Sequence, residues 1–92
     1  MLIAHFTTKN MTATTYAEVL RRLEAAGAGA PPGRLYHASY GSPEALRVTD
    51  VYDTPASFEQ FGAVLMPILG ALGIELLPPE VQQIHNVILP RR

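Results

Sequence analysis

The order of elements predicted from this sequence assigns it to the α+β class, with two helices covering one face of a four-stranded antiparallel sheet. Segments with the two-residue alternation of a strand and the 3.6-residue period of a helix follow one another as strand, helix, strand, strand, helix, strand. The two middle strands are separated only by the turn residues 41–43, which predicts a hairpin. The order contains two strand–helix–strand units. Right-handed crossovers in both units place both helices on one face of the sheet.

Residues 2–8 predict the first strand, since they include β-branched and aromatic residues and contain no breaker. Asn10 or Thr12 is then expected to cap the first helix, and Gly27 is typical of a left-handed helix end. The apolar positions of this helix recur at i, i+3, i+4 and i+7, and they are Tyr16, Val19, Leu20, Leu23 and Ala26.

Residues 34–40 and 44–53 predict the two strands of the hairpin, and residues 81–89 predict the fourth strand. The expected spatial order is 4-1-3-2, which is the ferredoxin-like βαββαβ arrangement. The second helix is expected to start at Pro55, where a missing N–H has no consequence, and to run to about residue 72. Pro67 lies inside it and predicts a kink or break near Met66.

The composition indicates one domain over residues 1–92 that pairs with a second copy. Hydrophobic residues make up 48% of the chain and charged residues only 16%, against about 25% in a typical soluble protein. Few charges therefore remain to cover the second face of the sheet. We expect a homodimer, closed across that face.

Several functional classes have little support. The net charge is −1 and the only basic pairs are Arg21–Arg22 and Arg91–Arg92, so no nucleic-acid partner is expected. Cysteine is absent, which excludes a disulfide framework and thiolate chemistry. The N-terminus lacks the pattern of a signal peptide, and the apolar run 61–74 is shorter than the roughly 20 residues that span a membrane. No membrane partner is expected, and the expected location is cytoplasmic.

Residues 46–61 join the third strand to the second helix, and they carry a family resemblance. An aromatic residue, Tyr52, ends the strand, a capped turn at Thr54 follows, and Phe58 begins the apolar stripe of the helix. In this pattern, and in element order over nearly the whole chain, the sequence resembles the small antibiotic-biosynthesis-monooxygenase-like domains of the dimeric α+β barrel superfamily. That superfamily includes cofactor-independent monooxygenases, haem-degrading enzymes, isomerases and cyclases, so the fold does not fix the function.

The resemblance implies a cavity between sheet and helices and no bound cofactor. Haem-degrading relatives have a tryptophan where this chain has Tyr52, and they carry an iron-binding histidine on the second helix. Residues 58–72 contain no histidine, which argues against haem degradation.

The candidate catalytic residues are His5, His37, Asp50 and His85. Each histidine falls in a predicted strand, and strands one and four are neighbours, so His5 and His85 are expected to lie side by side. His37 is expected to approach His85 of a second subunit across the barrel. Each histidine could act as a general base, belong to a three-histidine metal site, or simply form hydrogen bonds within the sheet. The spacing of the histidines does not match that of metal ligands, so no metal is expected.

Asp50 and Tyr52 share one face of the third strand, where an unpaired buried carboxylate would be unfavourable. Asp50 is either an acid or base in a pocket, or it pairs with Arg47, Arg34 or a histidine on a neighbouring strand. Tyr52 is the first choice for the wall of a ligand site.

The remaining candidate ligand-binding residues are apolar, apart from one amide beside His85. Tyr16, Tyr36 and Tyr40 are further aromatics that can line a cavity, although core packing explains most such residues equally well. The expected function is binding of a small aromatic or apolar molecule, with cofactor-independent oxygenation or isomerisation as the implied chemistry. The alternative is a non-catalytic dimerisation or ligand-sensing module. The candidates are Phe6, Phe58, Phe61, Met66 and Asn86.

Overall fold

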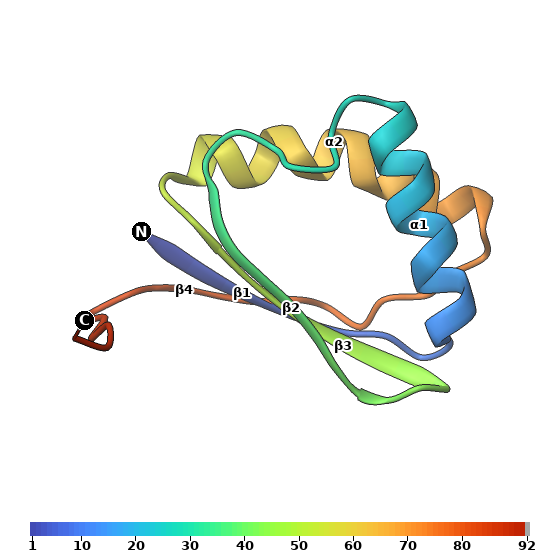
Figure 1. Cartoon of the computed structure of the whole chain (residues 1–92). Helices are drawn as coiled ribbons and strands as arrows, with labels where there is room; N and C mark the ends of the chain where they lie inside the picture. Colours follow the sequence, from blue (N-terminus) through green and yellow to red (C-terminus); the bar gives the residue numbers. More distant parts are fainter. Residues whose placement is uncertain (92) are drawn as a thin grey trace.

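The computed structural model describes residues 1–91; Arg92, half of the terminal basic pair, lies outside the described residues. The sheet has the order β2-β3-β1-β4 with antiparallel neighbours throughout, and both helices lie on one face of it (Figure 1). The predicted ferredoxin-like α+β fold and its strand order are confirmed. The elements are β1 (Leu2–Thr7), α1 (Ala13–Ala25), β2 (Arg34–Ser42), β3 (Ala45–Tyr52), α2 (Pro55–Ala71) and β4 (Glu80–Gln83).

Local chemistry fixes the ends of α1. Thr12, one of the two predicted caps, accepts a hydrogen bond from the Thr15 amide, and the Thr15 hydroxyl accepts one from the Thr12 amide. Gly27 has a φ of +76°, the left-handed conformation predicted for it. The apolar stripe faces the sheet, with Val19 and Leu23 buried.

The helix α2 continues through Pro67 to Ala71, so of the kink or break predicted near Met66 the break is wrong. A proline in a helix interior removes one hydrogen bond and is unfavourable by about 3 kcal/mol. Phe61 and Leu69, on either side of the proline, are both buried in the core. Burial of both halves offsets the lost hydrogen bond and keeps the helix in one piece.

The strand β4 is shorter than predicted, because its partner ends. Gln83 pairs with Leu2, the first residue of β1, and the Ile84 amide then donates to the Met1 carbonyl. The strand β1 itself spans only Leu2–Thr7, so its pairing with β4 stops there. His85 and Asn86 therefore follow the strand in an exposed segment, where they were expected within it. Figure 1 shows this segment leading away from the sheet to the C-terminus.

The core fills the space between the helices and the sheet, and the opposite face of the sheet is left uncovered. Tyr52 and Ala4 on the covered face are completely inaccessible to solvent. The uncovered face includes Tyr36 and Tyr40 among other side chains from all four strands, and both tyrosines are exposed. Over residues 1–91, neither helix is long and apolar enough to cross a membrane.

Candidate active site

A histidine and an aspartate meet on the covered face of the sheet. His37 of β2 pairs directly with Asp50 of β3, and His37 Nδ1 lies 2.5 Å from Asp50 Oδ1. Asp50 is only 2% exposed, whereas His37 keeps part of its surface accessible. Of the pairings expected for Asp50, the structure selects the histidine on a neighbouring strand.

Tyr52 satisfies the other oxygen of the same carboxylate. Its hydroxyl donates to Asp50 Oδ2 at 2.8 Å, two residues along the same face of β3. Burial raises the pKa of the Tyr52 hydroxyl far above its usual range, and the charge of Asp50 adds to the rise. Tyr52 is therefore a fixed hydrogen-bond donor, and it holds the carboxylate in one orientation.

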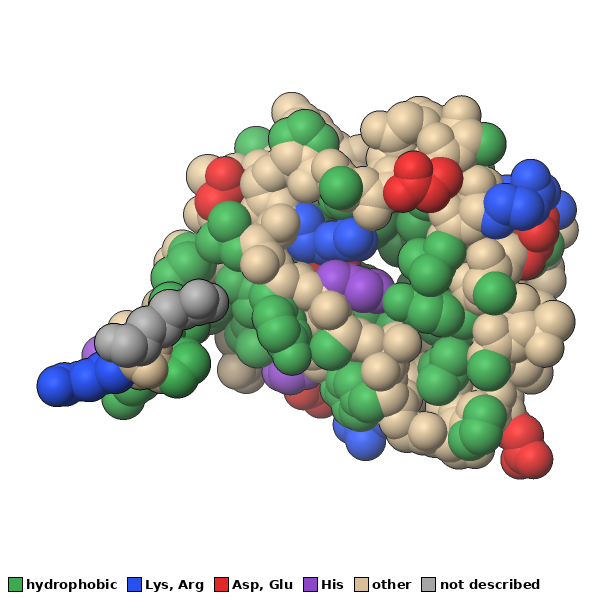
Figure 2. Space-filling view, viewed as in Figure 1, with side chains coloured by type: hydrophobic (Ala, Val, Ile, Leu, Met, Phe, Trp, Pro, Cys, Tyr) green, Lys and Arg blue, Asp and Glu red, His purple; other side chains and the backbone are tan. Residues whose placement is uncertain are grey.

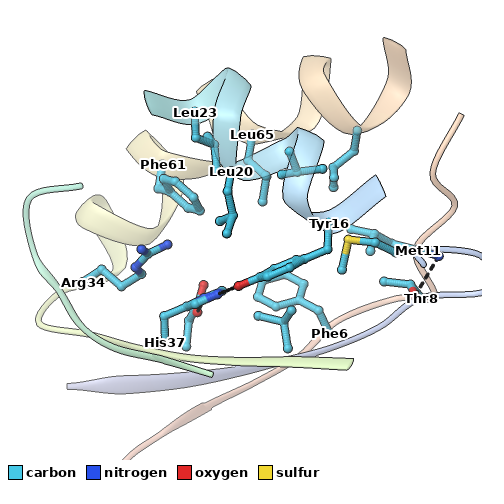
Figure 3. A pocket seen from close by; sticks show the side chains of 15 residues that line it. Phe6, Thr8, Met11, Tyr16, Leu20, Leu23, Arg34, His37, Phe61 and Leu65 are labelled. Carbon is cyan, nitrogen blue, oxygen red and sulfur yellow. Dashed lines mark hydrogen bonds and ion pairs between the residues drawn. The ribbon is translucent and has the colours of Figure 1, made fainter. Parts of the chain in front are cut away.

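Tyr16 of α1 completes a chain of four polar side chains. Its hydroxyl lies 2.6 Å from His37 Nε2, and the two ring planes are within 3° of parallel. In the neutral imidazole with Nδ1–H donated to the Asp50 carboxylate, Nε2 carries the lone pair and accepts from the Tyr16 hydroxyl. Aspartate thus orients the imidazole, leaving Nε2 as a proton acceptor that faces α1 (Figure 3).

A β-bulge brings Arg34 to the same face. Arg34 pairs with Tyr52, Tyr36 with Val51 and His37 with Asp50, so one extra residue of β2 is accommodated between Arg34 and Tyr36. Without the bulge, residues 34 and 37 would point to opposite faces. With it, the guanidinium lies 5.1 Å from the centroid of the Phe61 ring, above His37 (Figure 3).

These groups surround a hollow between the helices and β2. Figure 2 shows a histidine and a basic side chain at its opening, with hydrophobic side chains on the opposite wall. The cavity has a volume of about 50 Å³ and is lined by Tyr16, Arg34, His37 and Asp50 together with apolar side chains. A second cleft, of about 370 Å³, lies between α2 and residues 76–79 and is lined by the Tyr52 ring. The polar chain belongs to the small cavity, whereas the larger space has almost wholly apolar walls.

The other two histidines do not join the site. His5 lies on the uncovered face, where its Nδ1 is 2.9 Å from the Thr49 hydroxyl, and its neighbour on β4 is Glu80. The expectation that His5 and His85 lie side by side is wrong, because β4 ends before His85. In the part of the chain that the structure describes, no three histidine or acidic side chains are arranged to hold a metal.

The predicted ligand-binding residues divide into two groups. Phe6 and Phe61 line both the cavity and the cleft, whereas Phe58 and the 53% exposed Met66 line the cleft alone. Asn86 follows β4 and lines neither space. Tyr36 and Tyr40 also line neither, because they point to the uncovered face.

The roles of two residues in the site are not evident from the sequence. Arg34 had been considered only as a partner for Asp50, because simple alternation along β2 gives no sign of the bulge. Tyr16 had been expected in a cavity wall, but its bond to His37 depends on how α1 crosses the sheet. Strand order allows a histidine from either strand next to β3 to reach Asp50, and the register of β2 selects His37.

Several solved structures share this fold at low sequence identity. A candidate antibiotic biosynthesis monooxygenase from Deinococcus radiodurans superposes with a TM-score of 0.68 at 15% identity, covering 100% of both chains. SnoaB, a cofactor-independent oxygenase from Streptomyces nogalater, gives 0.62 at 16%, covering 95% of this chain and 93% of SnoaB. HapK from Hahella chejuensis gives 0.66 at 8%, covering 99% of this chain and 100% of HapK.

The fold is therefore that of the antibiotic-biosynthesis-monooxygenase-like proteins, which confirms the predicted resemblance at the level of fold. No family model matches the sequence, and a search among curated proteins finds no significant match.

Proposed function

We propose that this protein binds a small aromatic molecule between its sheet and helices and oxygenates it with molecular oxygen, without a cofactor. The observation that supports the proposal is the His37–Asp50 pair in the wall of an otherwise apolar cavity. An apolar site with a few convergent polar groups is the usual form of a small-molecule site. The solved structure of a cofactor-independent oxygenase with the same fold is consistent with this chemistry.

The proposed role of His37 is that of a general base. A substrate group that replaces the Tyr16 hydroxyl at Nε2 loses its proton to the imidazole, and Asp50 stabilises the resulting imidazolium. For an anthrone, the carbanion gives electrons to O₂ and forms a carbon–oxygen bond. The peroxide takes up a proton to give a hydroperoxide. Its O–O bond and the remaining C–H bond on the same carbon then break, a carbonyl forms and water leaves. Anthrone and O₂ thus become anthraquinone and water.

Substrate binding needs more room than the cavity alone offers. Ligand pockets commonly measure about 300 Å³ or more. The side chains of Phe6, Phe61 and Leu65 line both the small cavity and the 370 Å³ cleft, so they form the partition between the two spaces. Rotation of these side chains would join the cleft to the cavity that contains His37.

Oxidation of 1,8-dihydroxyanthrone tests the proposal. We expect the purified protein to accelerate formation of the quinone over the rate in buffer, with one O₂ consumed per quinone. Quinone absorbance and an oxygen electrode measure the two quantities. Protein treated with a metal chelator should oxidise the anthrone at the same rate as untreated protein. A rate no greater than that of heat-denatured protein at the same concentration would refute the proposal for anthrones.

A second candidate function is a non-catalytic dimerisation or ligand-sensing module. The small volume of the cavity favours it, because at about 50 Å³ the interior is nearly filled by its own side chains. A thermal-shift screen with quinols and fatty acids separates the candidates, since a true ligand raises the melting temperature by mass action. Binding without turnover would support the sensing module.

Both candidate functions include a homodimer, formed through the uncovered face of the sheet. We expect light scattering at micromolar concentration to give twice the 10.0 kDa of one chain. Val51→Lys places a charge on that face and should give the monomer, because burying an unpaired charge is unfavourable. Gln60→Lys, at an exposed position of α2, is the matched control and should leave the mass doubled. A monomeric wild-type protein would contradict the expectation.

A further inference from the structure

We infer that the molecule bound at this site is an aromatic carboxylate, or an aromatic with an equivalent anionic group, and that Arg34 recognises the anion. The inference rests on the proposed function for the location of the ligand, and it adds the chemical class of that ligand. It follows from three features of Arg34: its placement by the bulge, its unused donors, and its position between two spaces.

The bulge is what gives Arg34 access to the site. Gly33, with a φ of +83°, leads the chain into β2, and its carbonyl accepts a hydrogen bond from the Asp53 amide. A side chain at position 33 would collide with Ser57 and Asp53, so the entry to the strand is closely defined. The extra residue that follows turns Arg34 toward His37. Bulges of this kind are over-represented beside active sites, where they redirect one side chain.

Most of the donors of Arg34 are unused. Among the described residues, no carboxylate lies within 4.0 Å of its guanidinium. Nη2 makes a long contact of 3.3 Å to the Gly29 carbonyl, and the guanidinium also acts on the Tyr52 hydroxyl, where it opposes the rise in the pKa. Asp50 does not need Arg34 as a partner, because His37 and Tyr52 already donate to its two oxygens. A guanidinium has five N–H donors in a planar fork that matches a carboxylate.

Arg34 also lies where an anion can reach it. It lines the apolar cavity on one side and, on the other, a polar groove of about 280 Å³ beside residues 30–37. His37 is shared by the same two spaces. An aromatic ring on the cavity side would contact Phe61 and Leu65, and its carboxylate would face the guanidinium at the groove. The charged group then remains hydrated while the ring is buried.

A pair of unreactive probes tests the inference. 2-Naphthoate and 2-naphthamide share one ring system and differ in charge, and calorimetry gives the dissociation constant of each. We expect the wild-type protein to bind naphthoate at least about tenfold more tightly, since hydrogen bonds from a guanidinium to a carboxylate are stronger than those to a neutral amide. Arg34→Met should reduce the ratio to about one, and Arg34→Lys should retain part of it.

Arg47→Met is the matched control, because Arg47 lies on β3 but packs against Tyr40 on the uncovered face. This variant should keep the wild-type ratio. Equal affinities for the two probes in the wild-type protein, or no binding of either, would overturn the inference even if anthrone is oxidised. A preference for naphthoate that depends on Arg34, without anthrone oxidation, would support the inference and refute the proposed oxygenation.

Discussion

Tyr52→Ala should lower the free energy of unfolding by about 3–5 kcal/mol, the range for removing a large buried aromatic side chain. Tyr52 is completely inaccessible to solvent, and its ring packs edge-on against Phe58 at 5.3 Å and tilted against Phe61 at 6.3 Å. The substitution also leaves a buried oxygen of Asp50 without its donor. A domain of this size has only about 5–15 kcal/mol of stability, so urea denaturation should show a large shift.

Met66→Ala is the control for size, since Met66 is a large side chain on α2 but exposed; we expect a change within about 0.5 kcal/mol. Tyr52→Phe separates the hydroxyl from the ring. The folded-state pKa of Tyr52 lies above the unfolded value of 10.0, so its contribution is full below pH 10 and declines as the pH rises further. Tyr52→Phe should remove that alkaline loss. Equal costs for Tyr52→Ala and Met66→Ala would contradict the core position of Tyr52.

His37→Gln should lower the rate of anthrone oxidation by about 10²- to 10⁴-fold, which is the usual contribution of a general base. Glutamine keeps a polar side chain of similar length, but it cannot accept and carry the proton. The effect should fall on kcat more than on KM, because the proton transfer belongs to the transition state. Initial rates from quinone absorbance over a range of anthrone concentrations give both constants.

His5→Gln is the matched control, because the same substitution is made on the opposite face of the sheet. Its rate should stay within about twofold of wild type. Melting curves and circular dichroism should show that both variants fold. A wild-type rate in His37→Gln would exclude His37 as the base, and an equal loss in His5→Gln would show that the loss is not specific to His37.

The sequence predicted the fold well because the determinants of the fold are local. The caps at Thr12 and Thr54 and the two apolar periodicities each depend on residues a few positions apart. The predictions that were wrong concern features that depend on residues far apart in the sequence. The end of β4 is set by the start of β1, and the continuity of α2 through Pro67 is set by burial on both sides of the proline.

The candidate site was predicted only in part, for the same reason. The predicted strand order put both His5 and His37 on strands next to β3, so it allowed a histidine partner for Asp50 without selecting one, and alternation placed Asp50 and Tyr52 on one face. Arg34 reaches this face through a bulge between Arg34 and Tyr36, and no glycine or proline lies at those positions to indicate it. All three histidines fall in predicted strands, so the sequence does not distinguish between them. Only the pairing of strands shows that His37, and not the other two, lies beside Asp50.

The site is divided between parts of the sheet that differ in how easily they open. Asp50 belongs to β3, which has strands on both sides, whereas His37 and Arg34 belong to β2, the strand at the edge of the sheet. Edge elements exchange their amide hydrogens through local opening well before the whole protein unfolds. Fraying of β2 would withdraw the imidazole and the guanidinium while the carboxylate and Tyr52 stayed in the core. We therefore expect moderate heating to disrupt the candidate site reversibly, at temperatures where the rest of the fold persists.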